Sequence, residues 1–295
     1  MTQYHQALAL LVTFIWGTNF VLIRHALEEM EPFTLAALRF LFVAIPLIFF
    51  LPKPKVQWRY IIAYGLLIGV GQFGLLFWAM RADITPGLAS LIIQLQVFFT
   101  VLLTVGILKE SVSTRQITAM IISFLGLVLI FLNTNETTTL IGVSVVLVAA
   151  MSWASGNLII KHIGKVDSFA FLAWSSLCAV PPLTLVAFYT YGTDDVVSSM
   201  VHASWYAWAT VLWQSVGNML IGYGLWNMLL HRYSAASVSP WALMVPVFGM
   251  STSWLVLAEP MPWWKLVAMG LIIAGLALNI VGDFRKFASS RAKKI

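Results

Sequence analysis

The sequence contains little charge and almost no cysteine. Only 9% of its 295 residues are charged, 60% are apolar, and the mean hydropathy is +0.90. A soluble globular protein carries about 25% charged residues. So few charges cannot cover a water-exposed surface, and we therefore expect lipid to be the solvent for most of the chain. The single cysteine, Cys178, excludes an intramolecular disulfide.

Sequence motifs of enzymes are also missing. There is no Gly-x-Ser-x-Gly, no His-Glu-x-x-His and no glycine-rich phosphate loop ending in Lys-Ser/Thr. The eleven acidic residues and five histidines fall at the ends of apolar runs or between them. None is therefore predicted at membrane depth to act as an acid, base or nucleophile. We expect no enzyme, no metal and no cofactor, and keep a membrane enzyme or a channel only as remote alternatives.

Ten apolar runs are present, each long enough to approach the roughly 20 residues that span a bilayer as a helix. The longest separating stretch, 191–204, is predicted to be a loop. The first run lacks a basic leader, so we interpret it as a membrane helix rather than a signal peptide. The runs are 6–24, 33–51, 60–79, 86–108, 116–132, 140–160, 168–190, 206–229, 236–257 and 263–282.

The distribution of Lys and Arg predicts the orientation, because cytoplasmic loops of membrane proteins are rich in both. With the N-terminus inside, thirteen of the 17 basic residues fall in cytoplasmic loops or the C-terminal tail, and three fall in outer loops. We therefore predict a multi-pass inner-membrane protein with both termini cytoplasmic. The net charge of +6 then favours anionic lipid, not nucleic acid, as the partner of the tail. The basic tail residues are Arg285, Lys286, Arg291, Lys293 and Lys294.

The two halves of the chain resemble each other. The stretch 16–25 recurs as 153–162 at an offset of 137 residues, and 110–126 recurs as 259–275 at an offset of 149. Five helices per half is an odd number, so the second half enters the membrane from the opposite side. Inverted repeats of this kind are typical of secondary transporters. We predict an all-α membrane protein of ten transmembrane helices. Its two repeats are residues 1–135 and 136–295.

Several short motifs are spread along the chain. They are Ile15-Trp16-Gly17-Thr18-Asn19-Phe20, Leu35-Ala36-Ala37-Leu38-Arg39-Phe40 after Pro32, Ala89-Ser90-Leu91, Ser152-Trp153-Ala154 and Gly222-Tyr223-Gly224-Leu225-Trp226. These motifs resemble the EamA family of the drug/metabolite transporter superfamily, and the resemblance covers nearly the whole chain. It implies the ten-helix fold, a central cavity between the halves, and export of compounds of the O-acetylserine and cysteine class. Ala119, Ala268 and Lys265 depart from the residues usual in the family.

Polar and aromatic residues near the middle of the runs form a candidate substrate site. Polar side chains in lipid usually face the bundle interior, and inverted-repeat carriers bind substrate at the midplane. Amides can bind both a carboxylate and an ammonium group, and aromatic rings attract cations. The set therefore suits zwitterionic or neutral metabolites, unless some amides only hold helices together. The residues are Trp16, Asn19, Gln72, Gln94, Gln96, Trp153, Asn157, Gln214, Asn218 and Tyr223.

Three charged residues are candidate carboxylate or gate contacts. Arg39 lies inside the second run and could bind a substrate carboxylate. We favour the interpretation that it reaches the outer interface or pairs with a loop acid such as Glu31. Glu110 and Glu259 recur at equivalent positions, and we favour solvated charges at helix ends over gate contacts.

These observations predict an exporter of amino acids or their derivatives that works by alternating access. Proton relays usually need a carboxylate or histidine inside the membrane, so we do not expect tight proton coupling. Export of other neutral, aromatic or drug-like solutes stays open, as does proton-coupled antiport. The expected partners are a small-molecule substrate and the lipid bilayer, with the chain as a monomer or a homodimer.

Overall fold

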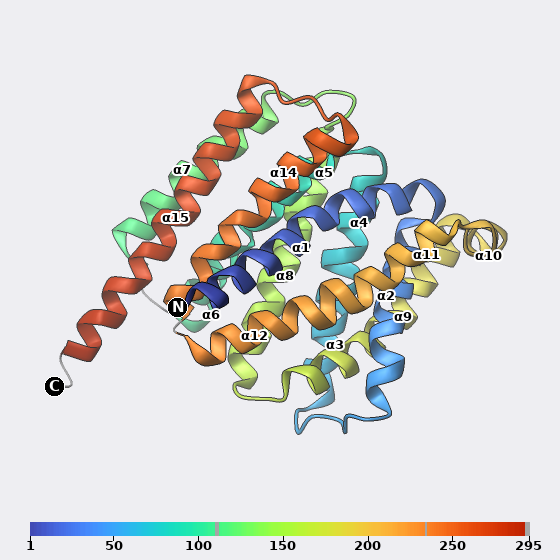
Figure 1. Ribbon diagram of the computed structural model, residues 1–295, viewed down its shortest axis with the longest axis horizontal. Helices are drawn as coiled ribbons and strands as arrows, with labels where there is room; N and C mark the ends of the chain where they lie inside the picture. The colour runs from blue at the N-terminus through green and yellow to red at the C-terminus, as the bar shows by residue number, and fades with distance from the viewer. Residues whose placement is uncertain (110–111, 234, 293–295) are drawn as a thin grey trace.

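The computed structural model describes residues 1–109, 112–233 and 235–292. In this part of the chain the elements are helices joined by short connections (Figure 1). They are α1 (Gln3–Glu29), α2 (Pro32–Ile48), α3 (Trp58–Gly65), η1 (Leu66–Gly74), α4 (Leu75–Ala82), α5 (Pro86–Ile92), η2 (Ile93–Leu95), α6 (Gln96–Leu108), α7 (Thr114–Phe131), α8 (Leu140–Ile163), α9 (Ser168–Tyr191), α10 (Thr193–His202), α11 (Trp205–Leu212), η3 (Trp213–Gly222), α12 (Tyr223–Arg232), α13 (Ala235–Val238), η4 (Ser239–Leu243), α14 (Met244–Leu257) and α15 (Trp263–Ala292).

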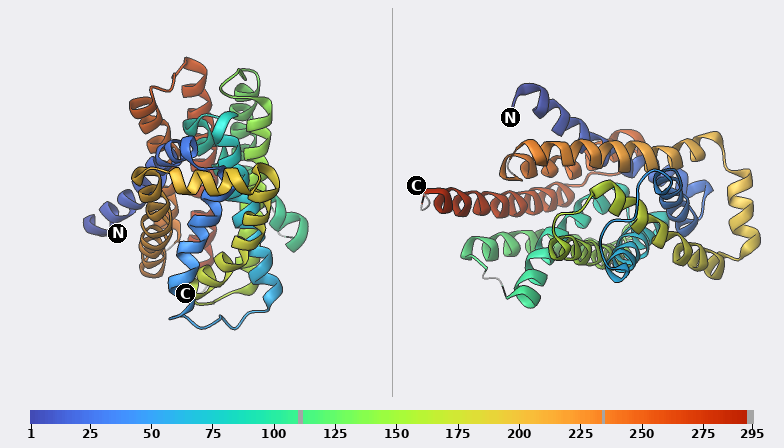
Figure 2. Two further views of the ribbon diagram at one scale, coloured as in Figure 1. Left: turned by 90° about the vertical axis from the view of Figure 1, so that its right-hand side faces the viewer. Right: turned by 90° about the horizontal axis from the view of Figure 1, so that it is seen from below.

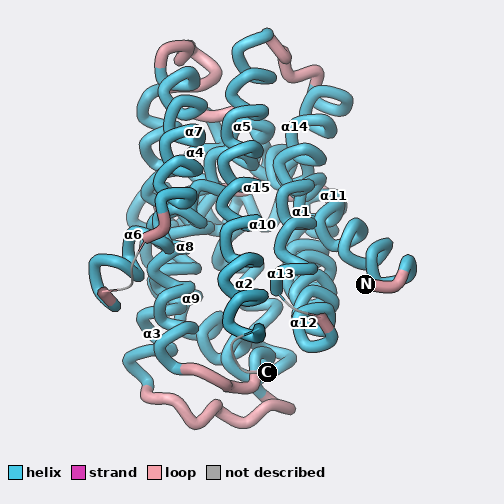
Figure 3. The backbone as a smooth tube through the Cα atoms, turned by 90° about the vertical axis from the view of Figure 1, so that its left-hand side faces the viewer, coloured by secondary structure: helices cyan, strands magenta, loops and turns pink. Residues whose placement is uncertain are grey.

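Long apolar helices make up the bundle, as the hydropathy of the sequence predicts. Seven helical stretches among the described residues are long and apolar enough to cross a membrane. Two shorter apolar helices, α2 and the first part of α15, accompany them. The connections gather at the two ends of the bundle (Figure 3). The described part of the chain is therefore a bundle of helices with the length and composition of a multi-pass membrane protein.

One prediction about the connections is wrong. The stretch 191–204 is not a simple loop, because it contains helix α10. Gly192 ends α9 with a φ of 83°, a backbone conformation that glycine adopts readily. Asp194 and Asp195 then lie in the first turn of α10, where the helix dipole favours negative charge. Figure 2 shows α10 at the end of the molecule away from the N-terminus.

Four long helical stretches change their pitch part-way along. The π-helical segments η1 and η3 interrupt α3–α4 and α11–α12, and the 3-10 segments η2 and η4 precede α6 and α14. Both α6 and α14 end at a left-handed residue, Lys109 (φ 56°) and Ala258 (φ 51°) respectively. A π-helical segment has a wider turn than an α-helix and is frequently found at functional sites.

Helices distant in sequence pack side by side. α7 lies along α15 at one edge of the molecule, α2 packs on α9, and α1 packs on α14 (Figure 1). Glycines permit the close approach of α7 and α15. A Cβ on Gly126 would lie 2.9 Å from Ile272, and one on Gly275 would lie 2.5 Å from the Ala119 carbonyl oxygen. The first and second halves of the chain therefore interlock.

Candidate functional site

Arg39 lies at the centre of a buried polar network. Its side chain extends from α2 and is fully buried, with 0% exposure. Nη1 donates to Oε1 of Gln214 at 2.9 Å, and Nη2 donates to Oδ1 of Asn218 at 3.1 Å. Nε donates to Sδ of Met219 at 3.2 Å, and the guanidinium carbon lies 3.7 Å from the centroid of the Phe73 ring. Neutral dipoles and an aromatic face thus surround the cation.

The expectation that Arg39 reaches the outer interface or pairs with Glu31 is wrong. Glu31 forms its ion pair with Arg81 instead. The physical reason is the packing of η3 against α2, which brings amide oxygens within hydrogen-bonding distance of the guanidinium. Because these groups replace part of the lost hydration, the side chain need not extend to water.

The π-helical segment η3 presents several of these groups on one face. Gln214, Asn218 and Met219 follow one another at spacings of four and one, and the wide π-helical turn lets all three approach Arg39. The Ser215 hydroxyl donates to the main-chain carbonyl of Arg39 at 3.0 Å. The η3 segment therefore contacts both the side chain and the backbone of α2.

Helix α1 completes the network from a third direction. Asn19 donates from Nδ2 to Oε1 of Gln214 at 3.2 Å, and Nε2 of Gln214 donates back to Oδ1 of Asn19. The Trp16 indole donates to the main-chain carbonyl of Asn218 at 3.4 Å, and its ring lies 5.2 Å from that of Tyr223. We call this group the Arg39 cluster. Its members are Trp16, Asn19, Arg39, Gln214, Asn218 and Tyr223.

The remaining predicted amides lie apart from the Arg39 cluster. Asn157 of α8 donates to Oε1 of Gln96 at 2.9 Å, and both side chains are half-buried. Gln94 is buried and donates to the Ala242 carbonyl at 3.3 Å. Gln72 is buried on η1. In the described part of the chain, no hydrogen bond joins these residues to the Arg39 cluster, so the structure brings together only part of the predicted set.

Tyr64 packs beside the α8 residues, and the sequence did not single it out. Its ring centroid lies 5.0 Å from that of Phe171 on α9. A Cβ on Gly156, the residue before Asn157, would lie 3.5 Å from the Tyr64 ring. Trp153 is half-buried one turn before Asn157 and packs against the apolar core. An aromatic residue in an apolar run gives no sequence signal that separates a site contact from a lipid contact.

Glu259 is also buried, so the expectation of a solvated charge at this position is wrong. It lies in the connection between α14 and α15, and its side chain is 3% exposed. Oε1 accepts from Nζ of Lys265 at 2.9 Å, and Oε2 accepts from the backbone N–H of Gly87 at 3.1 Å. This pair ties the α14–α15 connection to the start of α5. The equivalent Glu110 lies outside the described residues.

One further prediction also concerns residues that the structure does not describe in full. Lys293 and Lys294 of the basic tail lie outside the described residues, and only the backbone of α15 is described at Arg285, Lys286 and Arg291. The predicted lipid contact of the tail therefore stays a prediction.

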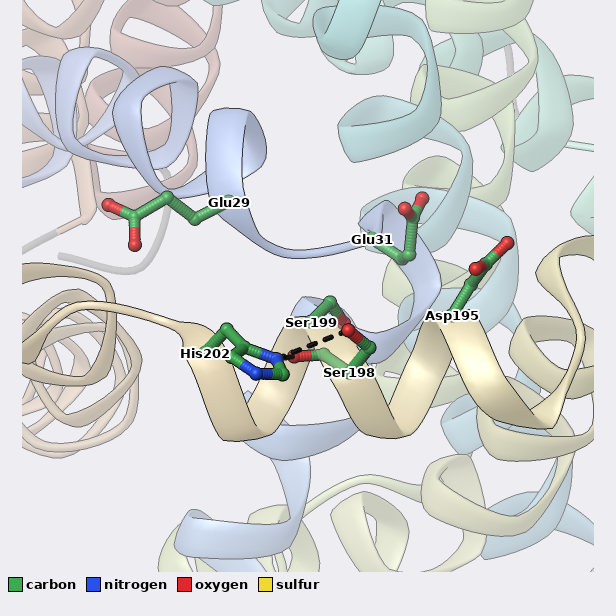
Figure 4. Close-up of a pocket in the computed structure, with 6 residues that line it drawn as sticks. All are labelled: Glu29, Glu31, Asp195, Ser198, Ser199 and His202. Carbon is green, nitrogen blue, oxygen red and sulfur yellow. Dashed lines mark hydrogen bonds between the residues drawn. The ribbon is translucent and has the colours of Figure 1, made fainter.

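A surface pocket of about 370 Å³ lies where the α1–α2 connection faces α10 (Figure 4). The carboxylate of Glu29 accepts from the backbone N–H and the hydroxyl of Ser204, at 2.6 and 2.7 Å. The pocket contains none of the predicted site residues. Its lining residues are Glu29, Glu31, Asp195, Ser198, Ser199 and His202.

Comparison with known proteins identifies the family. The model of the EamA-like transporter family matches residues 5–132 and again residues 140–281. The chain belongs to this family. The resemblance seen in the sequence motifs is therefore confirmed, and membership of a transporter family favours a transporter over an enzyme.

Relatives of the EamA-like chain match it over almost its full length. A protein of Salmonella typhimurium (strain LT2) named "Probable amino-acid metabolite efflux pump" is 37% identical over 288 residues, with 96% of each chain covered. An Escherichia coli (strain K12) protein of the same name is 34% identical, again with 96% of each covered. A solved crystal structure shares the fold, with a TM-score of 0.62, 15% identity, and coverage of 95% of this chain and 99% of that chain.

Proposed function

We propose that the chain exports amino acids or their derivatives, of the O-acetylserine and cysteine class, across the bacterial inner membrane by alternating access. The Arg39 cluster is the observation that carries this proposal. It combines a buried cation, three amides and two aromatic rings on helices from both halves of the chain. The two efflux-pump relatives support the choice of substrate class.

The proposed architecture is ten transmembrane helices in two inverted repeats, residues 1–135 and 136–295, with both termini cytoplasmic. Two matches of one family model, one in each half, support the repeat. The paired irregular segments and the left-handed ends of α6 and α14 support it as well, because Lys109 and Ala258 are 149 residues apart, the same offset as in the sequence repeat. The excess of Lys and Arg in the predicted cytoplasmic loops supports the orientation.

The proposed transport cycle requires the predicted outer end of the bundle to open. Hydrogen bonds among the described residues link connections at this end. Glu259 binds Lys265 and the start of α5, and the Thr139 hydroxyl donates to Oδ1 of Asp83 at 2.9 Å. These hydrogen bonds join connections from different parts of the chain. Release of substrate to the outside would require at least some of them to break, so we assign Glu259 to the outer gate.

A proton-coupled antiporter is the second candidate function, and the burial of Glu259 is the observation that favours it. A coupling carboxylate must be alternately buried and accessible, and Glu259 is buried in this structure. The Arg39 cluster contains no carboxylate or histidine, which favours an uncoupled cycle at the substrate site itself. The two candidates differ in their response to a pH gradient.

Counterflow in liposomes tests the proposed function. The purified protein would be reconstituted, and uptake of labelled cysteine or O-acetylserine would be measured with and without a pH gradient. We expect saturable counterflow that is insensitive to the gradient and is lost in Gln214→Ala. The control is Ser144→Ala, an exposed α8 residue that only bonds the backbone of its own helix at Leu140. Absence of counterflow for both compounds would contradict the substrate assignment, and dependence on the gradient would favour the antiporter.

A further inference from the structure

The charge of Arg39 has no counter-ion among the described residues. Every partner of its guanidinium is neutral, namely two amide oxygens, one thioether sulfur and the Phe73 ring. A charged group that is buried without an opposite charge is unfavourable unless dipoles compensate it fully. An anion that enters this site would therefore gain the attraction of an unneutralised cation in a low-dielectric interior.

The hydrogen-bonding capacity of Arg39 is also incompletely used. A guanidinium has five N–H donors. Three of them are engaged, one each on Nε, Nη1 and Nη2. One N–H on each terminal nitrogen is therefore left for a ligand. Two donors on a planar cation match the two oxygens of a carboxylate, the pairing in which arginine binds most strongly and with the greatest geometric specificity.

The surroundings suit the other end of an amino acid. Asn218 bonds both the Arg39 guanidinium, through its side chain, and the Trp16 indole, through its carbonyl. Trp16 in turn stands beside Tyr223 and Trp226, with ring centroids 5.2 and 5.3 Å away. Aromatic faces attract ammonium groups. A zwitterion could therefore place its carboxylate at the guanidinium and its ammonium group toward these rings.

We propose that Arg39 recognises the free carboxylate of the transported solute, so that the carrier selects carboxylates over their esters and over decarboxylated amines. This inference rests on the proposed function, since it assigns a substrate class to the same site. It makes Arg39 a substrate-binding residue as well as a link between α2 and η3. If Arg39 were purely structural, replacing it would change the affinity for every ligand by the same factor. If Arg39 recognises the carboxylate, replacing it changes the ratio of the dissociation constants of different ligands.

The test compares three probes on the wild-type protein: L-cysteine, its methyl ester and cysteamine, which lacks the carboxylate. Ligand-induced thermal stabilisation in detergent gives a dissociation constant for each without requiring transport. We expect cysteine to bind at least about tenfold more tightly than either analogue, because a hydrogen-bonded charge pair is lost in both. Equal binding of the three, or no binding of cysteine, would overturn the inference.

Variants then test whether Arg39 causes the preference for cysteine over its methyl ester. Arg39→Gln is expected to bind cysteine and the ester within about twofold of each other, and Arg39→Lys to keep part of the preference because it keeps the charge. Arg24→Gln is the matched control and should keep the full preference. Among the described residues, Arg24 bonds only the Arg81 carbonyl, which lies outside the cluster. An unchanged preference in Arg39→Gln would overturn the inference. If that variant does not fold, the wild-type ratio and Arg39→Lys still decide.

Flux separates this inference from the proposed function. Selective binding of cysteine without counterflow would support the carboxylate site and contradict export. Equal counterflow of cysteine and its methyl ester would support export and contradict the carboxylate site.

Discussion

Two helix–helix contacts differ completely in chemistry, although each packs an α-helix against a stretch that contains a π-helical segment. In one, α9 packs on α3 and η1 through small residues, and a Cβ on Gly65 would lie 2.5 Å from the Ser175 carbonyl oxygen. In the other, α2 packs on η3 through hydrogen bonds between Arg39 and the amides of Gln214 and Asn218. We call these the glycine contact and the arginine contact.

The difference shows which contact can bind a solute. The glycine contact leaves no space, because atoms of α9 already occupy the volume of a side chain. The arginine contact consists of polar groups, and its guanidinium has N–H donors beyond the three that bond Gln214, Asn218 and Met219. We therefore expect the glycine contact to determine stability and the arginine contact to determine transport.

Enlarging the glycine contact should produce the largest loss of stability. Gly65→Val would place two methyl groups where even a Cβ lies 2.5 Å from the Ser175 carbonyl oxygen and 3.1 Å from Cβ of Cys178. Overpacking of this kind typically costs 1–3 kcal/mol, so a backbone clash should cost about 3 kcal/mol or more. Chemical denaturation in detergent measures the loss, with Gly106→Val as the control. Apart from its own helix backbone and chain neighbours, no atom of the described residues lies within 4 Å of the Gly106 Cβ position. Unchanged stability of Gly65→Val would show that α3 and α9 are not close-packed.

Removing the charge from the arginine contact should reduce transport far more than stability. Arg39→Met keeps much of the volume and removes a buried cation that has no counter-ion among the described residues, although it also leaves Oδ1 of Asn218 without this donor. We expect counterflow of cysteine to fall by roughly 100-fold, about 2.7 kcal/mol, with the midpoint of thermal unfolding lowered by only a few degrees. Loss of folded protein with residual wild-type transport would reverse the assignment of the two contacts.

A charged contact outside both regions tests whether burial of charge alone matters. Glu259→Gln leaves Lys265 buried without its anion, although Gln can still accept from Gly87 and Lys265 keeps its bond to the Pro260 carbonyl at 3.0 Å. We expect the free energy of unfolding to fall by about 2 kcal/mol, less than the 3–5 kcal/mol lost when a buried ion pair is fully broken. The double variant Glu259→Gln with Lys265→Met should recover much of it. Additive losses in the double-mutant cycle would contradict a coupled pair.

The smallest effect is expected at Ser175. In the part of the chain that the structure describes, its hydroxyl bonds only the backbone of its own helix, at Phe171 and Leu172. Ser175→Ala should therefore change stability by less than about 1 kcal/mol and leave counterflow unchanged. A strong transport defect in Ser175→Ala would show that the glycine contact also takes part in substrate binding.

The positions of the helices were predictable because the solvent imposes them. A bilayer demands long apolar helices, and each of the ten apolar runs is helical in the structure. Helix α10 was missed because hydropathy does not detect a polar helix. The Gly192 break followed by Asp194 and Asp195 was the available signal. The π-helical pitch of η1 and η3 could not be foreseen, because it depends on packing against neighbouring helices.

The candidate site was predictable in composition and less so in geometry. Depth in an apolar run indicates that a polar side chain faces inward, and Asn19, Gln214 and Asn218 do meet. The hydrogen-bond partners of Arg39 depend on distances between helices, and the pattern of apolar residues in the sequence does not contain this information. The same holds for Glu259 and Lys265, whose pairing follows from the path of a connection.

A structure of the protein with bound cysteine would show whether Arg39 binds the carboxylate of the solute. We expect a carboxylate oxygen within about 3 Å of Nη1 or Nη2 of Arg39, a hydrogen-bond distance, with the ammonium group toward Trp16 and Tyr223. Cysteine bound only in the surface pocket beside Glu29 and His202, or bound with its carboxylate away from Arg39, would contradict the proposed recognition.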